Sequence, residues 1–470
     1  MQTPFDLQIP REVMFPKIFK AYDVRALHPD PLGEKEAYAV GVGAGRFLKE
    51  QHGGPGRVLV TRDMRPHSPK LAAALIHGIR TTGMDVVDLG MADTSFLYFA
   101  IPHLDAVGGV QTTASHNPVE YNGFKISGAQ AKPIGADTGL KTIEGYAAEA
   151  HGSTSEPVGS LEEMDLWVEY REHVQSFLPK LKRPLKLFVD ASNGMAGKLV
   201  PQVFDGVENL EIIKLNFEIT GSFVHDPNPL VAENMVPTQE GVREHGAHLG
   251  ACFDGDADRC MLVDENGATI GCDHLTAWLA GHFLKSHPGS TIIYDLRSSK
   301  SVQEAIESAG GTPAKSRVGH VFMKALLRET DGVFGGELSG HFYFKGNNFA
   351  DSGAILLAVA LGVLAENDQP LSSLIKPYQK YPQSGEINFR TEDKDAVLAG
   401  LKRDHADGAE IDELDGVTID CFKTRGWWFN VRASNTEPLL RLNAEAKDAE
   451  TLETLLGELK PRLGEVAVGH

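Results

Sequence analysis

One sequence pattern occurs three times along this chain of 470 residues: a short apolar run that ends in polar residues, followed by a stretch typical of a helix. The apolar runs span residues 58–63, 185–190 and 291–295, and the helix-like stretches span residues 69–82, 197–205 and 301–310. Alternating strands and helices are typical of parallel sheets with crossover helices. The repeat therefore predicts three α/β units in tandem.

Each unit contains a second apolar strand that leads directly into a polar loop. These strands span residues 108–113, 249–253 and 332–336, and the loops that follow span residues 114–118, 254–259 and 337–341. In open α/β sheets, ligands bind just beyond the carboxyl ends of the strands. The three loops differ in chemistry, so we expect a single site to which each unit contributes one part.

The chain beyond about residue 382 breaks this pattern. Strands are predicted at residues 385–389, 417–422, 427–432 and 439–445, and helices at residues 393–407 and 449–463. Loop composition places boundaries near residues 160, 268 and 380. The prediction is four domains, at residues 1–160, 161–268, 269–380 and 381–470, of which the last is a small α+β domain.

Charge and cysteine content restrict the class of partner. Lys and Arg number 45 against 64 Asp and Glu, a formal net charge of −19 that excludes nucleic acid or an anionic membrane as the default partner. The four cysteines form no CxxC pair and are too sparse for a disulfide framework, so we expect a cytoplasmic protein. The longest apolar run, residues 354–365, is too short to span a bilayer and predicts a buried helix.

The loop that follows the apolar strand at residues 249–253 carries three aspartates at alternate positions, Asp254, Asp256 and Asp258. Carboxylate oxygens suit a hard cation such as Mg²⁺, and three together repel one another unless a cation neutralises them. Glu265 falls at the twelfth position of a possible EF-hand loop, but Arg259 stands where that loop requires glycine. A solvated acidic turn is the remaining alternative.

Ser115 lies in the sequence TTASHNP, at an expected junction between a strand and a helix. A serine there exposes its hydroxyl at the edge of the sheet, although it could also be an ordinary N-cap. A serine hydrolase is disfavoured because there is no GxSxG elbow and His116 is adjacent in the sequence. A serine beside a bound cation favours phosphoryl transfer, with Ser115 as the phosphate carrier.

Two further loops suit a phosphorylated sugar. Glu337, Ser339 and His341 alternate, so on extended backbone they would project the same way and could bind neighbouring hydroxyls, although a plain turn is equally compatible. The sequence RASNTEP begins with Arg432 and combines a guanidinium with hydroxyl and amide donors, which suits a phosphate dianion. Two further basic stretches span residues 20–25 and 57–70.

Taken together, these loops resemble the α-D-phosphohexomutase superfamily, and most closely its bacterial phosphomannomutase/phosphoglucomutase branch. The motifs follow the family's order over essentially the whole chain, at residues 19–25, 113–118, 121–125, 254–259, 317–320, 336–341 and 432–438. The resemblance implies an α/β fold in which three similar α/β domains with mixed sheets and a C-terminal phosphate-binding α+β domain surround a central cleft.

The resemblance also implies roles for individual residues. Ser115 would carry the phosphate and join Asp254, Asp256 and Asp258 as a Mg²⁺ ligand. Lys125 and His320 would transfer protons, while Arg25 and Arg259 would stabilise charge on the phosphoryl group. The implied substrate-binding residues are Tyr22, Arg297, Glu337, Ser339, His341, Arg432, Ser434, Asn435 and Thr436.

The implied reaction is a reversible, Mg²⁺-dependent conversion of hexose 1-phosphate to hexose 6-phosphate, for mannose or glucose, through a hexose 1,6-bisphosphate intermediate that also acts as activator. Phosphoglucosamine mutase, or a non-catalytic module that binds phosphosugars or divalent cations, are the alternatives. Small phosphosugars are the expected partners of a monomer or dimer. Lys20, Ala26 and Arg297 depart from the usual family pattern, and Ala26 indicates that its loop needs no positive φ.

Overall fold

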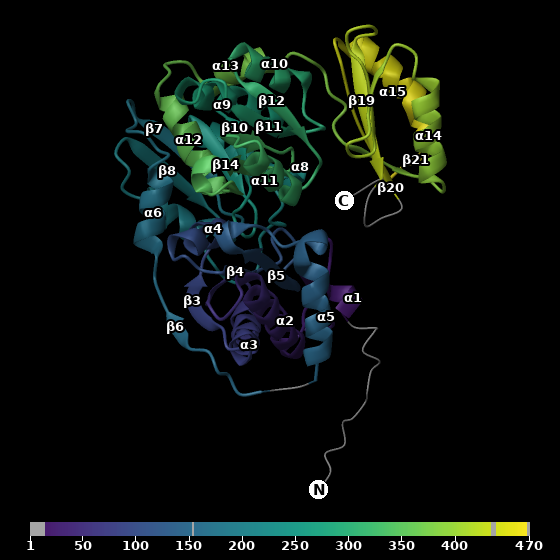
Figure 1. Ribbon diagram of the computed structural model, residues 1–470. Helices are drawn as coiled ribbons and strands as arrows, with labels where there is room; N and C mark the ends of the chain where they lie inside the picture. The colour runs from purple at the N-terminus through teal and green to yellow at the C-terminus, as the bar shows by residue number, and fades with distance from the viewer. Residues whose placement is uncertain (1–14, 153–154, 434–438, 468–470) are drawn as a thin grey trace. The chain divides into compact units, whose positions relative to one another are not determined.

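The computed structural model (Figure 1) describes residues 15–152, 155–433 and 439–467. The described residues form two compact units. The first unit holds the described residues up to 269 together with residues 341–368. The second holds residues 270–340 and the described residues from 369 onward. Residues 341–368 thus return to the first unit after the chain has left it.

The N-terminal part of the first unit is a six-stranded sheet in the order β1-β5-β4-β2-β3-β6. Its strands are β1 (Val24–Leu27), β2 (Arg57–Arg62), β3 (Asp85–Met91), β4 (Gly108–Thr112), β5 (Tyr121–Gly128) and β6 (Leu161–Glu163). The helices of this part are α1 (Phe15–Ile18), α2 (Glu34–His52), α3 (Ser68–Thr81), α4 (Thr94–His103) and α5 (Lys141–Ala150). β2 pairs in parallel with β3 and β4, whereas β5 runs antiparallel to β4 and β1.

Helices α2 and α3 pack unusually closely because glycines stand where their backbones meet. A Cβ atom on Gly41 would lie 2.2 Å from the carbonyl oxygen of Leu75, and one on Gly78 would lie 2.1 Å from that of Tyr38. Neither position can hold a larger residue without moving a helix. The apolar residues of α2 and α3 join those of β1, β2 and β5 in one buried core.

The second sheet of the first unit has the order β10-β9-β7-β8. It comprises β7 (Leu185–Asp190), β8 (Leu210–Leu215), β9 (Leu249–Phe253) and β10 (Cys260–Asp264), with helices α6 (Trp167–Gln175), α7 (Ala196–Phe204) and α8 (Ala232–His245). The unit is completed by the hairpin of β14 (Phe342–Phe344) and β15 (Ala350–Asp351) and by α12 (Gly353–Ala365). Every residue of α12 is buried, which confirms the prediction of a buried helix.

The second unit begins with a parallel sheet in which β11 lies between β12 and β13. These strands are β11 (Thr291–Asp295), β12 (Thr312–Ser316) and β13 (Phe334–Gly336), and the helices are α9 (Cys272–Ser286), α10 (Lys300–Ser308), α11 (His320–Glu329) and α13 (Leu371–Ile375). Strand and helix alternate here as they do in the first unit. The three predicted α/β repeats are therefore confirmed.

The C-terminal part of the second unit is an antiparallel sheet in the order β17-β18-β19-β20-β16-β21. Its strands are β16 (Ile387–Arg390), β17 (Glu410–Asp412), β18 (Val417–Cys421), β19 (Trp427–Ala433), β20 (Leu439–Ala446) and β21 (Glu465–Val466). Helices α14 (Lys394–Asp404) and α15 (Ala449–Leu463) pack on one side of this sheet (Figure 1). The predicted small α+β domain is confirmed.

The first unit differs from the parallel sheets that the strand–helix repeats indicate and agrees with the mixed sheets that the family resemblance implies. The strands that follow its polar loops, β5 and β10, run antiparallel to β4 and β9, so the sheets are mixed rather than wholly parallel. Ala26 lies within β1 and has no positive φ, as predicted. All four cysteines are buried, and none of them forms a disulfide within the described residues. No helix within the described ranges is long and apolar enough to cross a membrane.

Candidate functional site

Ser115 lies in a loop between two antiparallel strands. The loop joins the end of β4 at Thr112 to the start of β5 at Tyr121, so the expected junction with a helix, and with it the N-cap alternative, is wrong. The error arises because residues 121–128 pair back along β4 instead of beginning a crossover. Ser115 has a φ of 51°, in the left-handed region that non-glycine residues rarely adopt, and its side chain is buried.

A buried arginine, Arg65, binds the backbone carbonyl groups of this loop. The side chain of Arg65 is fully buried, and its Nε donates to Oδ2 of Asp63 at 3.1 Å. Its two Nη atoms donate to four backbone carbonyl oxygens at 2.6 to 3.1 Å, those of Ser115, Asn117, Pro118 and Tyr121. All five N–H groups of the guanidinium are thereby used, so Arg65 holds the loop's carbonyl groups in fixed positions.

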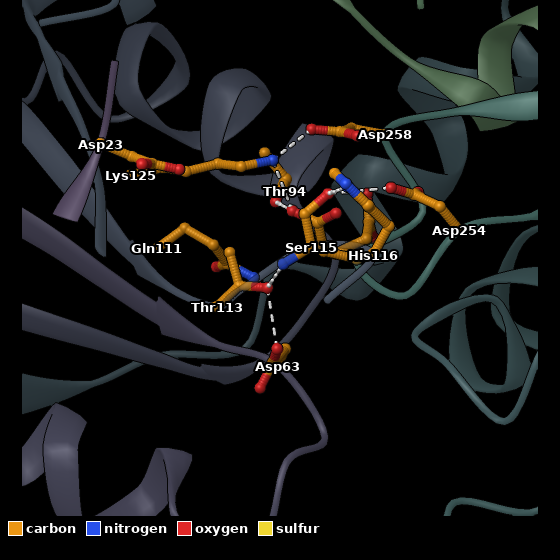
Figure 2. A network of polar contacts seen from close by, with 12 residues as sticks. Asp23, Asp63, Thr94, Gln111, Thr113, Ser115, His116, Lys125, Asp254 and Asp258 are labelled. Carbon is orange, nitrogen blue, oxygen red and sulfur yellow. Dashed lines mark hydrogen bonds and ion pairs between the residues drawn. The ribbon is translucent and has the colours of Figure 1, made fainter. Parts of the chain in front are cut away.

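Asp63 extends this support to the backbone of Ser115 itself. Its Oδ2 accepts from Oγ1 of Thr113 at 2.7 Å, and Thr113 Oγ1 in turn accepts from the amide of Ser115 at 3.0 Å (Figure 2). Asp63 Oδ1 also accepts from Ser68 Oγ and from the amide of Arg65. In the sequence this network is visible only as the basic stretch at residues 57–70, which by itself does not indicate a structural role.

The three aspartates lie on the turn between β9 and β10, and all are buried. One carboxylate oxygen from each falls within 4.8 Å of the others. Ser115 Oγ donates to Oδ2 of Asp254 at 2.9 Å, which joins the serine loop to the acidic turn (Figure 2). The buried Oδ1 of Asp256 has no hydrogen-bond partner within the described residues, and Oδ1 of Asp258 has the imidazole of His341 at 3.4 Å. Three buried carboxylates this close together fit a hard divalent cation.

Two basic side chains face these carboxylates. Lys125 Nζ, from β5, lies 2.6 Å from Asp256 Oδ2 and 2.5 Å from Asp258 Oδ2. Arg259 Nε lies 2.9 Å from Asp254 Oδ2. Burial by itself would lower the pKa of Lys125, but the charges of Asp256 and Asp258 outweigh it and hold that pKa well above the usual value. The cluster therefore combines high negative charge with two fixed cations.

The carboxylates themselves respond in opposite directions. Burial raises the pKa of Asp254 to about 7, against the opposing effect of Arg259. Burial acts in the same direction on Asp258, but Lys125 and His341 overcome it and hold the pKa of Asp258 well below its ordinary value. One turn thus contains carboxylates of very different proton affinity, which is common at functional sites.

Two residues flank the serine on its other side. An Nη atom of Arg259 contacts Nδ1 of His116 and lies 3.4 Å from Ser115 Oγ. Burial, followed by the charge of Arg259, holds the pKa of His116 well below its ordinary value. Arg25 donates to Asn117 Oδ1 at 2.6 Å and pairs with Asp23. Arg25 and Arg259 are therefore brought to the serine loop.

The start of α4 contributes a contact that sequence reasoning missed. The backbone amide of Thr94 donates to the carbonyl oxygen of Asp256 at 3.1 Å, and its hydroxyl donates to Asp256 Oδ2 at 2.5 Å. Asp93 caps the helix by accepting from the amide of Phe96. The Asp-Thr-Ser sequence at residues 93–95 is a recognisable helix start, but nothing in it indicates the acidic turn as a partner.

His341 joins the acidic turn from a part of the chain far away in sequence. Its Nε2 lies 3.4 Å from Asp258 Oδ1 and 3.7 Å from Asp351 Oδ2. The extended backbone considered for residues 337–341 is not found, because Gly340 adopts a φ of 89° and its amide bonds to the carbonyl of Glu337 at 3.0 Å. The segment is a turn, and the binding roles of its side chains stay a prediction.

The second unit holds several other predicted residues. Arg297 Nη2 pairs with Asp295 Oδ2 at 2.9 Å and lies 3.8 Å from Glu337 Oε1, which accepts from the amide of Gly319. His320 is the first residue of α11, and Ser339 lies in the turn after β13. Tyr22, in the first unit, precedes β1 and is half-buried. Ser434, Asn435 and Thr436 lie outside the described residues, whereas Arg432 lies on β19.

Comparison with known proteins finds four consecutive domain families. They are the α/β/α domains I, II and III of phosphoglucomutase/phosphomannomutase at residues 16–152, 167–267 and 272–381, and the C-terminal domain at residues 386–460. A Xanthomonas campestris protein named phosphohexose mutases is 39% identical over 446 residues, 94% of this chain and 98% of that protein. A Vibrio cholerae phosphomannomutase is 38% identical over 439 residues, 91% of this chain and 94% of that protein.

A solved structure of a Burkholderia thailandensis phosphoglucomutase/phosphomannomutase family protein gives the same result in three dimensions. It superposes with a TM-score of 0.86 at 32% identity, over 95% of this chain and 96% of that one. The family domains together cover most of the sequence, and the curated relatives match almost from end to end. The chain is therefore an enzyme of the isomerase class and belongs to the phosphoglucomutase/phosphomannomutase family.

Proposed function

We propose that this enzyme is a Mg²⁺-dependent mutase that interconverts the 1-phospho and 6-phospho forms of mannose or glucose through a phosphorylated Ser115. The observation that carries the proposal is the hydrogen bond from Ser115 Oγ to Asp254, inside a buried cluster of three carboxylates and two cations. Such a cluster can stabilise the charge on a transferring phosphoryl group. The names of the curated relatives support mannose as one substrate.

The proposed reaction consists of two phosphoryl transfers in opposite directions. In the first, the bond between phosphorus and Ser115 Oγ breaks as a bond forms to O6 of a hexose 1-phosphate, which gives the 1,6-bisphosphate and free serine. The sugar then turns around, and the phosphate on C1 returns to Ser115, which leaves hexose 6-phosphate. The proton lost by each attacking hydroxyl replaces the phosphate on the leaving oxygen, and we assign its transfer to Lys125 and His320.

Asp254, Asp256 and Asp258 would hold the Mg²⁺ ion, with the phosphate on Ser115 completing the ligand set. Bound Mg²⁺ would supply positive charge against the charge of the phosphoryl group. Arg259 and Arg25 lie at the serine loop and would neutralise the remaining charge. The backbone network of Arg65 would keep Ser115 Oγ aimed at the acidic turn throughout.

The remote phosphate of the sugar would bind to Arg432, Ser434, Asn435 and Thr436. Tyr22, Arg297 and His341 are proposed to line the substrate site, with Glu337 and Ser339 on hydroxyls that both orientations of the sugar share. Recognition at a distance from the reacting oxygen supplies binding energy that aligns that oxygen.

Replacing Lys125 with methionine should tighten divalent-cation binding while reducing mutase activity. Lys125 Nζ lies within 2.6 Å of the same carboxylates that would hold the cation, so the ammonium opposes a second positive charge there. We expect the Kd for Mn²⁺, used as the probe and measured by isothermal titration calorimetry, to fall by at least about tenfold. The exposed Lys132 is the control, and Lys132→Met should change neither quantity. Unchanged or weaker Mn²⁺ binding in Lys125→Met would contradict the assignment.

The reaction itself is tested with a panel of three sugars. Mannose, glucose and glucosamine 1-phosphates are incubated separately with the enzyme, Mg²⁺ and a trace of glucose 1,6-bisphosphate, and formation of each 6-phosphate is followed by phosphorus NMR. We expect conversion of the mannose or glucose compound to exceed that of the glucosamine compound, and mass spectrometry to find one phosphate on Ser115. Preference for glucosamine 1-phosphate would replace the proposal with phosphoglucosamine mutase, and binding without conversion would reduce the protein to a phosphosugar-binding module.

A further inference from the structure

Three arginines of the second unit converge on a single carboxylate. Glu386, immediately before β16, accepts from Arg432 Nη2 at 3.0 Å and Arg297 Nη1 at 3.3 Å through Oε2, and from Arg441 Nη1 at 3.1 Å through Oε1. The side chains of Arg297 and Arg432 are only 10% and 11% exposed, whereas Glu386 is 27% exposed. The carboxylate thus lies at the open side of a mostly buried guanidinium cluster.

The three guanidiniums share Glu386 in different ways. Arg297 also pairs with Asp295 and lies 3.8 Å from Glu337, whereas Arg432 and Arg441 both contact the carboxylate of Glu386. Burial, followed by the neighbouring charge of Arg297, lowers the pKa of Arg432. Burial would raise the pKa of Glu386, but the three arginines outweigh it and keep this carboxylate ionised. An ionised carboxylate therefore occupies guanidinium donors that a phosphate dianion could also bind.

Arg432 also has a buried N–H group without an acceptor among the described residues. Its Nε is buried and has no hydrogen-bond partner within the described residues, although its Nη2 is bound to Glu386. A buried N–H without an acceptor is costly, so this atom indicates a missing ligand. Glu386 follows Gly385, which has a φ of 66° and open space where a side chain would stand.

We propose that Glu386 is a built-in competitor for the remote phosphate of the sugar: its carboxylate occupies donors of Arg432 and Arg441 and is displaced when a phosphate dianion binds. This inference rests on the proposed function, which assigns Arg432 to that phosphate. A mutase must release its bisphosphate from the remote site so that the sugar can turn around. A carboxylate that takes back the guanidiniums weakens phosphate binding and speeds this release.

Removing the negative charge of Glu386 tests the proposal. A competitor's removal should tighten phosphate binding, whereas loss of a structural anchor should weaken it. Full-length Glu386→Gln and Glu386→Ala proteins are titrated calorimetrically with inorganic phosphate and with glucose 1,6-bisphosphate. We expect both variants to bind both probes at least about tenfold more tightly than the unmodified enzyme, and the difference to shrink in high salt. Glu410→Gln is the matched control, because Glu410 is an exposed acid of the same unit, paired with Lys423 outside this cluster.

Steady-state kinetics supply the second readout. If Glu386 competes with the remote phosphate, kcat and KM should fall together in Glu386→Gln, because substrate binds more tightly while reorientation of the bisphosphate slows. Weaker phosphate binding in both variants, or a raised KM, would overturn the proposal and make Glu386 a structural anchor for the arginines. Phosphate binding does not require turnover, so the titration tests the role of Glu386 separately from the proposed function. If the unmodified enzyme converts none of the three sugars, the proposed function is refuted, but the titration still decides the role of Glu386.

Discussion

Replacing Ser115 with alanine is expected to abolish conversion of hexose 1-phosphates to 6-phosphates, with a loss of at least about 10⁴-fold in kcat. The reason is covalent: the proposed reaction passes each phosphate through Ser115 Oγ, and alanine offers no oxygen to receive it. Added glucose 1,6-bisphosphate cannot restore activity, because the bisphosphate can leave its phosphate only on this residue. Formation of the 6-phosphate by the purified variant, in the presence of trace bisphosphate, is the measurement.

The matched control for this variant is Ser127→Ala. Ser127 is a buried serine on β5, the strand that also carries Lys125, so its replacement removes a hydroxyl from the same sheet. We expect Ser127→Ala to retain activity within a few-fold, and both variants to unfold at temperatures close to that of the unmodified enzyme. Substantial turnover by Ser115→Ala would refute the phosphoserine mechanism, since a merely structural serine would give two variants with similar activity.

Replacing Arg65 with methionine should destabilise the N-terminal part of the first unit by about 3–5 kcal/mol. The change leaves Asp63 as a buried carboxylate without its cation, and it removes the donors to four backbone carbonyl groups of the serine loop. We also expect kcat to fall, because Ser115 depends on this network for its left-handed backbone conformation. Urea denaturation followed by circular dichroism measures the first effect.

Arg80→Met is the appropriate comparison. Arg80 lies on α3 in the same sheet domain, but its Nε makes one hydrogen bond to a backbone carbonyl, that of Gly159, at 2.9 Å. We expect this variant to lose no more than about 1 kcal/mol of stability. Arg65→Lys should fall between the two, because an ammonium keeps the charge but has three donors instead of five. Equal stability of Arg65→Met and Arg80→Met would contradict the supporting role of Arg65.

Much of the fold could be predicted because the relevant signals are local. An apolar run that ends in polar residues identifies β2, β7 and β11, and helical patterns after each run identify the crossovers. The direction of the next strand is not a local property. Residues 121–128 pair antiparallel with β4 because of hydrogen bonds across the sheet, and the apolar pattern of a strand is compatible with either direction.

The candidate site likewise contains residues that sequence motifs indicate and residues that only the tertiary structure reveals. Ser115, the three aspartates, Lys125 and Arg259 belong to short motifs whose residue types already indicate phosphate and metal chemistry. Arg65, Thr94 and Glu386 are ordinary residues in the sequence, and they matter only through their partners. The alternation of polar residues at 337–341 suits an extended segment as well as a turn, and one positive φ at Gly340 makes this segment a turn.

The sequence by itself determined the order of the α/β repeats, the small C-terminal domain and the family, because these depend on patterns within a few tens of residues and on motifs in series. Only the tertiary structure decided which charges meet. Ser115 and Asp254 are 139 residues apart, and Lys125 and Asp256 are 131 apart, yet each pair is in hydrogen-bond contact. Glu386 reaches Arg297 across 89 residues. Electrostatic and hydrogen-bond energies depend on distance in space, and that distance exists only once the strands have paired.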